Sequence, residues 1–142
     1  MTRCEYVFRA ELADHRGVIR VVALREEQTL DDLHELFRAE FGWNDPHLYS
    51  FWLSGQISDG PETEYTAPYA LEDSEAQSAA TPIAGLGLKE GQQIGYVFDF
   101  GAEWEVEVTV SGIRDAAAEE YPRVLEREGE APPQYEYEDD HD

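Results

Sequence analysis

Two histidines and two acids form the one plausible set of metal ligands in this sequence. His34, His47, Asp99 and Glu105 supply the imidazole and carboxylate groups with which proteins hold zinc or iron. Their spacing matches no established ligand signature, and the single cysteine, Cys4, cannot form a cysteine cluster around zinc. The sequence therefore allows a divalent metal site without requiring one, and it predicts no other cofactor.

Each histidine also has a structural interpretation. His34 lies next to Leu33, at the border of an apolar helix face, where a hydrogen bond to a neighbouring strand would satisfy its ring. His47 follows Pro46 and could brace a turn. Both interpretations stay open at the level of sequence.

Four aromatic residues provide a second candidate site. Trp43, Tyr49, Phe100 and Trp104 could line a small-molecule pocket, and the two tryptophans lie at the ends of predicted elements. The alternative is that these side chains belong to the core, because a chain of this size must bury large apolar groups to offset its conformational entropy.

Motifs for catalysis are missing from the sequence. The triplet Asp-Phe-Gly at 99–101 occurs in the magnesium-binding loop of protein kinases, but this chain is too short for a kinase and lacks the other kinase loops. Neither Gly-x-Ser-x-Gly nor His-Glu-x-x-His is present. An enzyme is therefore not predicted, and a metal-dependent enzyme or metal-binding protein that uses the four ligands above is an alternative.

Charge is the outlying property of the composition. The chain has 32 acidic and 10 basic residues, a formal net charge of -22. Such a surface repels the phosphates of nucleic acid and of anionic membranes, so neither is expected as a direct partner. Two further explanations of the acidity are a salt-tolerant host and a role as an acidic mimic of nucleic acid.

Length and composition predict one domain of a cytoplasmic protein. The 142 residues, 42% of them hydrophobic, suit a single core at residues 1–125. Residues 54–82 are rich in small and acidic residues and predict a surface excursion, and residues 126–142 predict an acidic tail. The chain shows no secretory signal and no apolar run of membrane-spanning length.

Hydrophobic periodicity predicts the first half of the fold. Alternation predicts a strand over Cys4–Leu12, β-branched residues predict a return strand over Val18–Leu24, and an apolar run predicts a third strand over His47–Leu53. Between them, apolar residues at helical spacing predict a helix over Leu30–Phe41. Its ends are marked by capping residues: Thr29 with Asp32 at the start, and Gly42 at the end.

A second hairpin is predicted around Gly101. The apolar faces of the two strands match only if the loop has an odd number of residues, which favours a three-residue loop over Gly101–Glu103. This register pairs Phe100 with Trp104 and places Asp99 opposite Glu105.

Three blocks of sequence resemble the plasmid pRiA4b ORF-3-like family, some members of which are described as TnpR-like transposon passenger proteins. The blocks are TLDDLHELFRAEFGWNDPHLYSFWL, LKEGQQIGYVFDFGAEWEVEV and YPRVLEREGEAPP, and the likeness spans Tyr6 to Pro133. The resemblance implies a compact α+β domain and an association with mobile elements, but no established activity. The family usually has an acid where this chain has Ala102.

Together these features predict an α+β fold. A β-hairpin, a helix, a strand and a second hairpin form a mixed or mostly antiparallel sheet, with one main helix packed on a face in a β-grasp-like order. The predicted function is a non-catalytic binding or interaction domain with a protein partner that the sequence does not identify.

Overall fold

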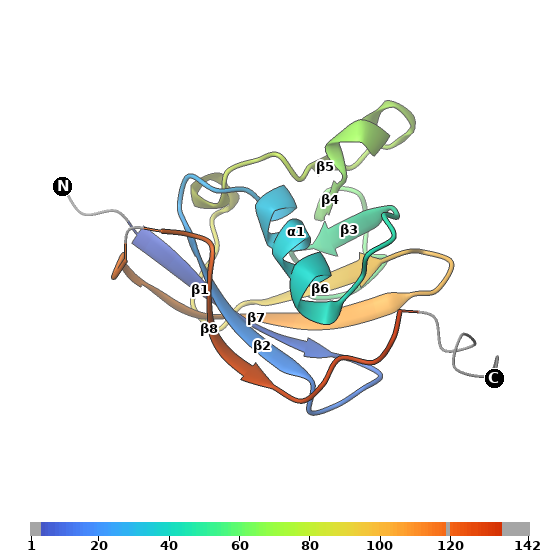
Figure 1. Ribbon diagram of the computed structural model, residues 1–142. Helices are drawn as coiled ribbons and strands as arrows, with labels where there is room; N and C mark the ends of the chain where they lie inside the picture. Colours follow the sequence, from blue (N-terminus) through green and yellow to red (C-terminus); the bar gives the residue numbers. More distant parts are fainter. Residues whose placement is uncertain (1–3, 119, 135–142) are drawn as a thin grey trace, which may run out of the picture.

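A computed structural model of the chain describes residues 4–118 and 120–134. One eight-stranded sheet carries a single α-helix on one face (Figure 1). The elements in chain order are β1 (Cys4–Leu12), β2 (Ile19–Arg25), α1 (Leu30–Phe41), β3 (Tyr49–Trp52), β4 (Glu64–Thr66), the 3₁₀ helix η1 (Pro68–Asp73), β5 (Gln77–Ser78), the 3₁₀ helix η2 (Ile83–Leu86), β6 (Gln93–Phe98), β7 (Trp104–Asp115) and β8 (Arg123–Glu128).

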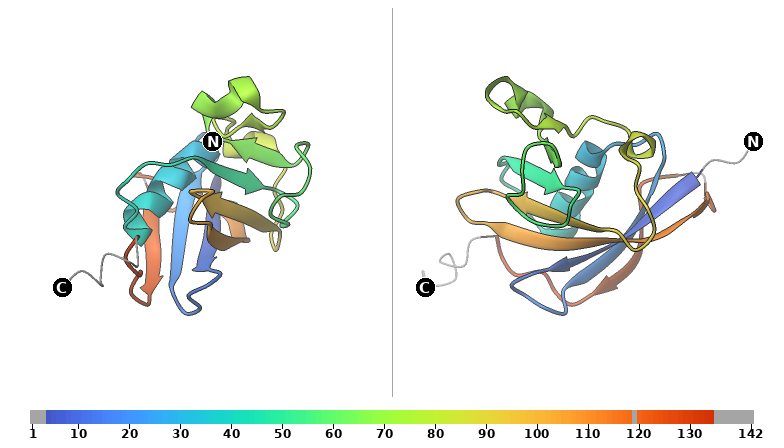
Figure 2. Two further views of the ribbon diagram at one scale, coloured as in Figure 1. Left: turned by 90° about the vertical axis from the view of Figure 1, so that its right-hand side faces the viewer. Right: turned by 180° about the vertical axis from the view of Figure 1, so that it is seen from behind.

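The sheet is mixed, and its spatial order is β5-β4-β3-β6-β7-β1-β2-β8. Every described pairing is antiparallel except the short β4–β5 pair. Views from the side and from behind show α1 against one face of the twisted sheet (Figure 2). The predicted α+β class with one helix and a mixed sheet is confirmed, and the likeness to a β-grasp arrangement stays a prediction.

The helix begins and ends at the predicted caps. The Thr29 hydroxyl accepts a hydrogen bond from the Asp32 amide at 3.1 Å, and the Asp32 carboxylate accepts one from the Thr29 amide at 3.0 Å. Gly42 follows the last turn with φ 75°, the left-handed conformation that glycine adopts without steric cost. These two devices fix the length of α1 and so the position of each residue on its buried face.

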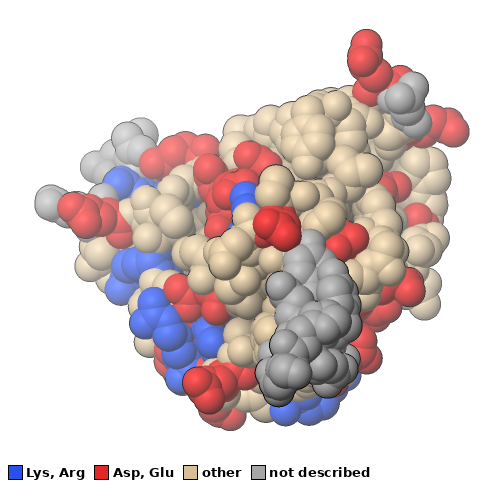
Figure 3. All heavy atoms as spheres, turned by 45° about the vertical axis from the view of Figure 1, so that its right-hand side comes forward, with Lys and Arg blue, Asp and Glu red and all other residues tan. Residues whose placement is uncertain are grey.

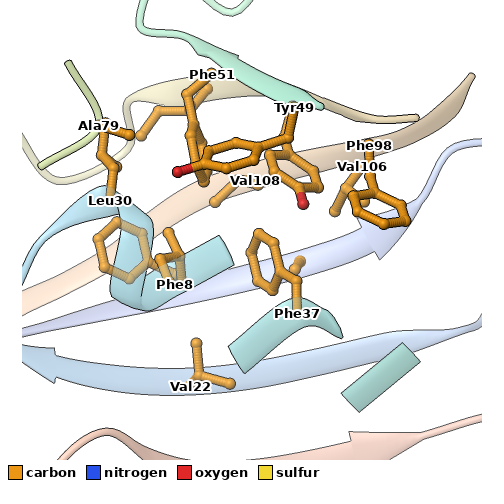
Figure 4. Close-up of a cluster of buried hydrophobic side chains, with 14 of the residues drawn as sticks. Phe8, Val22, Leu30, Phe37, Tyr49, Phe51, Ala79, Phe98, Val106 and Val108 are labelled. Carbon is orange, nitrogen blue, oxygen red and sulfur yellow. The ribbon is translucent and has the colours of Figure 1, made fainter. Parts of the chain in front are cut away.

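The core lies between α1 and the inner face of the sheet. Phe37 projects from the helix into a layer of aromatic rings supplied by β3 and β6 (Figure 4). Its ring centroid lies 5.2 Å from that of Tyr96 and 6.5 Å from that of Phe51. Phe8 and Val22, fully buried residues of the first hairpin, line one side of this layer. Phe8 and Val22 therefore belong to the face of the first hairpin that contributes to the core.

The second hairpin has a longer loop than predicted. β6 and β7 pair Phe98 with Trp104, so the loop is Asp99–Glu103 rather than Gly101–Glu103. Glu105 lies opposite Val97, not opposite Asp99. Both loop lengths are odd, so the apolar faces still match, and the hydrophobic pattern alone could not distinguish them.

The segment over 54–82 is more regular than an excursion. Ser50–Trp52 of β3 pairs with β4, which extends the sheet, and η1 and the two-residue β5 follow. Ala67 and Ala79 are fully buried, and the Ala79 carbonyl accepts a hydrogen bond from the Asp31 amide at 2.9 Å. Part of this segment therefore belongs to the core and helps to hold the start of α1.

The predicted acidic tail begins later than residue 126. β8 includes Glu126–Glu128 and pairs with β2 at the edge of the sheet. Charged residues suit an edge strand because one side of it faces water. The rest of the predicted tail from 135 to 142 lies outside the described residues. Within the described part of the chain, no helix has the length and apolar character needed to span a membrane.

Candidate functional site

His34 is a core residue that joins the helix to the sheet. Its Nδ1 lies 2.8 Å from the hydroxyl of Tyr96, and its ring stacks on that of Tyr49 with centroids 3.6 Å apart. Burial, together with the positive charge of Arg38, lowers the pKa of His34 to about 3. The imidazole is therefore neutral near pH 7 and is engaged by the sheet, as its structural interpretation predicts.

Tyr49 continues this polar network towards the start of the helix. Its hydroxyl donates a hydrogen bond to a carboxylate oxygen of Asp31. Burial and the carboxylate of Asp31 raise the pKa of Tyr49, and burial raises the pKa of Tyr96. Both phenols are therefore protonated near neutral pH, where they serve as hydrogen-bond donors.

His47 and Asp99 are the two predicted metal ligands that lie close together. His47 Nε2 is 3.5 Å from Asp99 Oδ2, and its ring stands edge-on to Phe98. The other carboxylate oxygen of Asp99 accepts the amides of Gly101 at 3.2 Å and Ala102 at 3.3 Å. Asp99 therefore organises the loop in which it lies.

The four predicted ligands do not converge on one point. His34 lies inside the core, whereas Glu105 belongs to β7 opposite Val97. Across residues 4–118 and 120–134, no group of three His, Cys, Asp or Glu side chains is arranged to hold a metal ion. Asp99 and His47 by themselves supply two ligands, fewer than a protein zinc site uses.

Of the four aromatic residues predicted to line a pocket, some lie in the core and others at the surface. Trp43 and Tyr49 are buried, and Trp43 stacks on Phe98 with centroids 4.8 Å apart. Trp104 is half-buried against the core, whereas Phe100 is 45% exposed. A cavity of about 250 Å³ lies elsewhere, between the loop at Gly55 and Ile57 and strands β6 and β7, and none of the four aromatics lines it.

Three large apolar side chains are exposed in the described residues: Leu48 at 42%, Tyr69 at 70% and Phe100 at 45%. We call Leu48, Tyr69 and Phe100 the apolar trio. All three are tied to one short backbone segment. The Asp99 amide, one residue before Phe100, donates to the Leu48 carbonyl at 2.8 Å, and the Tyr69 hydroxyl donates to the His47 carbonyl at 3.4 Å.

The loop that carries Phe100 has a fixed backbone. Asp99 and Glu103 have φ values of 63° and 55°, in the left-handed region that non-glycine residues seldom adopt. The Glu103 amide donates to the Asp99 carbonyl at 2.6 Å, in addition to the two bonds that the Asp99 carboxylate accepts. Strain of this kind persists only where the surroundings hold it, and it gathers at functional loops.

Sequence reasoning found one member of the trio and missed two. Phe100 was a predicted pocket residue, but Tyr69 lies in the segment interpreted as an excursion without periodicity. Leu48 was assigned to the third strand, which instead begins at Tyr49. The one available signal was that Leu48 falls on the opposite face from Tyr49 in the predicted alternation.

A buried carboxylate at the other end of the sheet was also missed. Glu5 is fully buried, and its oxygens accept hydrogen bonds from Arg114 at 2.5 Å, Tyr121 at 2.6 Å and Arg123 at 3.3 Å. No local pattern indicates this cluster, because the partners of Glu5 are more than 100 positions away in the chain. The cluster joins the end of β7, the start of β8 and Tyr121 between them to the first hairpin.

Residues 5–136 match the family described as plasmid pRiA4b ORF-3-like protein. The chain belongs to this family. A related family protein is the uncharacterized protein y4hQ of Sinorhizobium fredii (strain NBRC 101917 / NGR234), 30% identical over 118 residues that cover 82% of this chain and 58% of the relative. This pRiA4b ORF-3-like chain thus spans less than two thirds of that relative's length.

A solved structure supports the fold of this pRiA4b ORF-3-like protein. It is the crystal structure of a protein of unknown function, MM3350, from Methanosarcina mazei Go1. The TM-score is 0.74 at 20% identity, and the match covers 94% of this chain and 74% of the other. At this identity the similarity concerns the fold alone.

Proposed function

We propose that this protein is a non-catalytic binding domain that engages a protein partner through the apolar trio. The observation that carries the proposal is the fixed loop that holds Phe100 in solvent. A loop whose backbone is already ordered loses little conformational entropy when it binds. An exposed aromatic side chain on such a loop is typical of the anchor residues that dominate interface energies.

The polar groups of the core support binding over catalysis. A general acid or base must reach its substrate and needs a pKa near the working pH. His34 is enclosed between Tyr49 and Tyr96, and its pKa is far below neutrality. The hydroxyls of the two tyrosines are also engaged within the fold. These groups position α1 on the sheet and leave the surface as the functional part of the molecule.

The proposed setting is the cytoplasm, in association with plasmids or other mobile elements. The family name motivates the second part of this setting. Within that setting the partner is a protein, because the net charge of -22 disfavours nucleic acid and anionic membranes.

Capture from cells of the natural host tests this function. The full chain and a Leu48→Ser, Tyr69→Ser, Phe100→Ser variant are used as baits, and retained proteins are quantified by mass spectrometry. All three positions are exposed, so the variant should fold, which circular dichroism checks. Leu125→Ser, a half-buried leucine on the edge strand β8, is the matched control.

We expect at least one protein to be retained by the wild type and by Leu125→Ser but not by the triple variant. If all three baits retain the same proteins in the same amounts, the apolar trio is not the binding surface and the proposed function is wrong.

A further inference from the structure

We propose that the apolar trio docks a basic segment of the partner protein, one in which a large apolar side chain is flanked by lysine or arginine. This inference rests on the proposed binding function and names the chemistry of the partner. It follows from the uneven distribution of charge over the chain.

Basic residues are concentrated outside the part of the chain that carries the trio. Residues 39–113 contain 13 acidic side chains and one basic side chain, Lys89. Lys89 precedes β6, whereas Phe100 follows it, so they lie at opposite ends of that strand. In the space-filling view, basic side chains gather towards one side, and much of the remaining face is acidic or uncharged (Figure 3).

Carboxylates without ion-pair partners occur in each of the three segments that carry the trio. Glu103 lies in the same loop as Phe100, Asp45 in the turn before Leu48, and Glu72 one turn after Tyr69 in η1. Asp45, Glu72 and Glu103 are all exposed, and none makes an ion pair to another described residue. Their charges are therefore available to a partner.

Arg38 and Arg16, two basic side chains outside residues 39–113, are already engaged. Arg38 donates to the Trp43 and Asn44 carbonyls at 3.1 and 2.8 Å, and it lies 3.4 Å from the Glu35 carboxylate. Arg16 makes two hydrogen bonds to Glu107, at 2.9 and 2.7 Å. Neither side chain is free to neutralise the carboxylates beside the trio.

Two acidic side chains contribute to the environment of Tyr69. Its pKa is raised by partial burial and by the charges of Asp31 and Glu35, although Arg38 acts in the opposite direction. The same field that disfavours a phenolate favours a cation from a partner. Exposed aromatic rings add to this preference, because a cation is attracted to the face of a ring.

Apolar anchoring and electrostatic attraction make separate contributions to such a complex. The anchor removes apolar surface from water, which salt does not weaken. The charges act across water and are screened, because the Debye length falls from about 10 Å at 0.1 M salt to about 3 Å at 1 M. A basic segment with an apolar anchor therefore binds in a way that depends on both the trio and ionic strength.

Selection from a displayed library of random peptides of about 12 residues tests the partner class. The bait is the full chain, and binders that also attach to a Leu48→Ser, Phe100→Ser variant are removed. We expect the retained sequences to be enriched in lysine or arginine around a leucine or an aromatic residue. Their Kd, measured by fluorescence anisotropy, should rise roughly tenfold or more in Phe100→Ser. It should also rise roughly tenfold between about 50 mM and about 500 mM NaCl.

Three outcomes would overturn the inference. Retained peptides that are uncharged or acidic would show that the trio takes a different partner, and the proposed binding function would stand if capture from cells still depended on the trio. Basic peptides that bind wild type and Phe100→Ser equally would show attraction to net charge alone. Selection that enriches no peptide would remove the trio as a peptide-docking surface.

Glu103→Lys is the matched charge variant for this experiment. It changes an exposed side chain next to the anchor and leaves Phe100 in place. The selected peptides should bind Glu103→Lys more weakly at low salt and nearly as well as wild type at high salt. Glu126→Lys, on β8 at the edge of the sheet, should leave the Kd unchanged within roughly twofold because its charge is screened at that distance.

Discussion

The ionised carboxylate of Glu5 allows a quantitative test of the structure. Burial opposes its ionisation, but hydrogen bonds from Tyr121, Arg114 and Arg123 outweigh that effect and lower the pKa of Glu5 from 4.5 to about 2. One pKa unit corresponds to about 1.4 kcal/mol, so ionised Glu5 stabilises the folded state by about 3 kcal/mol at pH 7. Because the folded pKa lies below the unfolded one, this stability is complete above pH 4.5 and is lost as the pH falls towards 2.

The substitution Glu5→Gln keeps the size of the side chain and removes its charge. We expect it to lower the free energy of unfolding by about 3 kcal/mol at pH 7, and the difference from wild type to shrink by about 2 kcal/mol at pH 3. Urea unfolding followed by tryptophan fluorescence at the two pH values measures both quantities. Glu126→Gln, at an exposed site, should change the free energy of unfolding by no more than about 0.5 kcal/mol.

A Glu5→Gln effect of equal size at pH 7 and pH 3 would refute this reasoning. It would mean that the glutamine amide disrupts the hydrogen bonds by its shape, whatever the charge of the acid. A difference below about 1 kcal/mol at pH 7 would show that the two arginines do not offset the cost of burying a carboxylate.

Three further substitutions test the fold by chemical denaturation. Tyr96→Phe removes the hydroxyl partner of His34 and leaves a buried nitrogen unpaired, which should cost about 1–3 kcal/mol. Gly95→Ala places a methyl group 3.0 Å from a side-chain carbon of Ile57, and the overpacking should cost about 1–3 kcal/mol. Thr29→Ala removes the cap of α1 and should cost about 1 kcal/mol.

Matched changes show whether each effect is specific. Tyr65→Phe alters a tyrosine whose hydroxyl makes no hydrogen bond to another described residue, so it should be nearly neutral. Gly101→Ala meets nothing closer than 3.5 Å, so it should cost less than Gly95→Ala. A Thr29→Ala variant as stable as wild type would show that the Asp32 side chain alone suffices to cap the helix.

The parts of the fold that depend on local chemistry could be predicted from the sequence. A capping box and a left-handed glycine are decided by residues within one helical turn, so both ends of α1 were predicted correctly from Thr29, Asp32 and Gly42. Strand Cys4–Leu12 was predicted correctly because a half-buried strand must alternate. Both features are determined by residues that are close together in the sequence.

The parts that depend on distant partners could not be predicted. The loop of the second hairpin is two residues longer than predicted because Asp99 closes it with its own side chain and with the Leu48 carbonyl, which belongs to another strand region. The Glu5 cluster likewise needs Arg114 and Tyr121, which only the folded chain brings together. The alternation of apolar residues restricts the hairpin to loops with an odd number of residues. It does not decide between two loops that both have odd length.

For the candidate site too, some features could be predicted from the sequence and others could not. Residue type suggested His34 as a metal ligand and Tyr49 and Phe100 as pocket residues, but type does not indicate burial: His34 and Tyr49 are buried, whereas Phe100 is exposed. Two aromatic residues, Trp43 in the core and Phe100 partly in solvent, have opposite exposures that their residue types do not indicate. The sequence therefore includes the residues of the surface but does not show which side chains are exposed to solvent.

The distribution of ion pairs bears on why this chain is so acidic. A salt-tolerant host favours acids over the whole surface, without regard to element. Here the buried or bridging acids Glu5, Glu40 and Glu107 are each paired with arginine, whereas Asp45 and Glu103 make no ion pair within the described part of the chain. Adaptation to salt would account for the number of acids, and acids away from the trio, such as Glu62 and Glu126, also make no ion pair within the described residues. The proposed docking of a basic segment concerns only the carboxylates beside the trio, because pairing Asp45 and Glu103 internally would cancel the field that a partner needs.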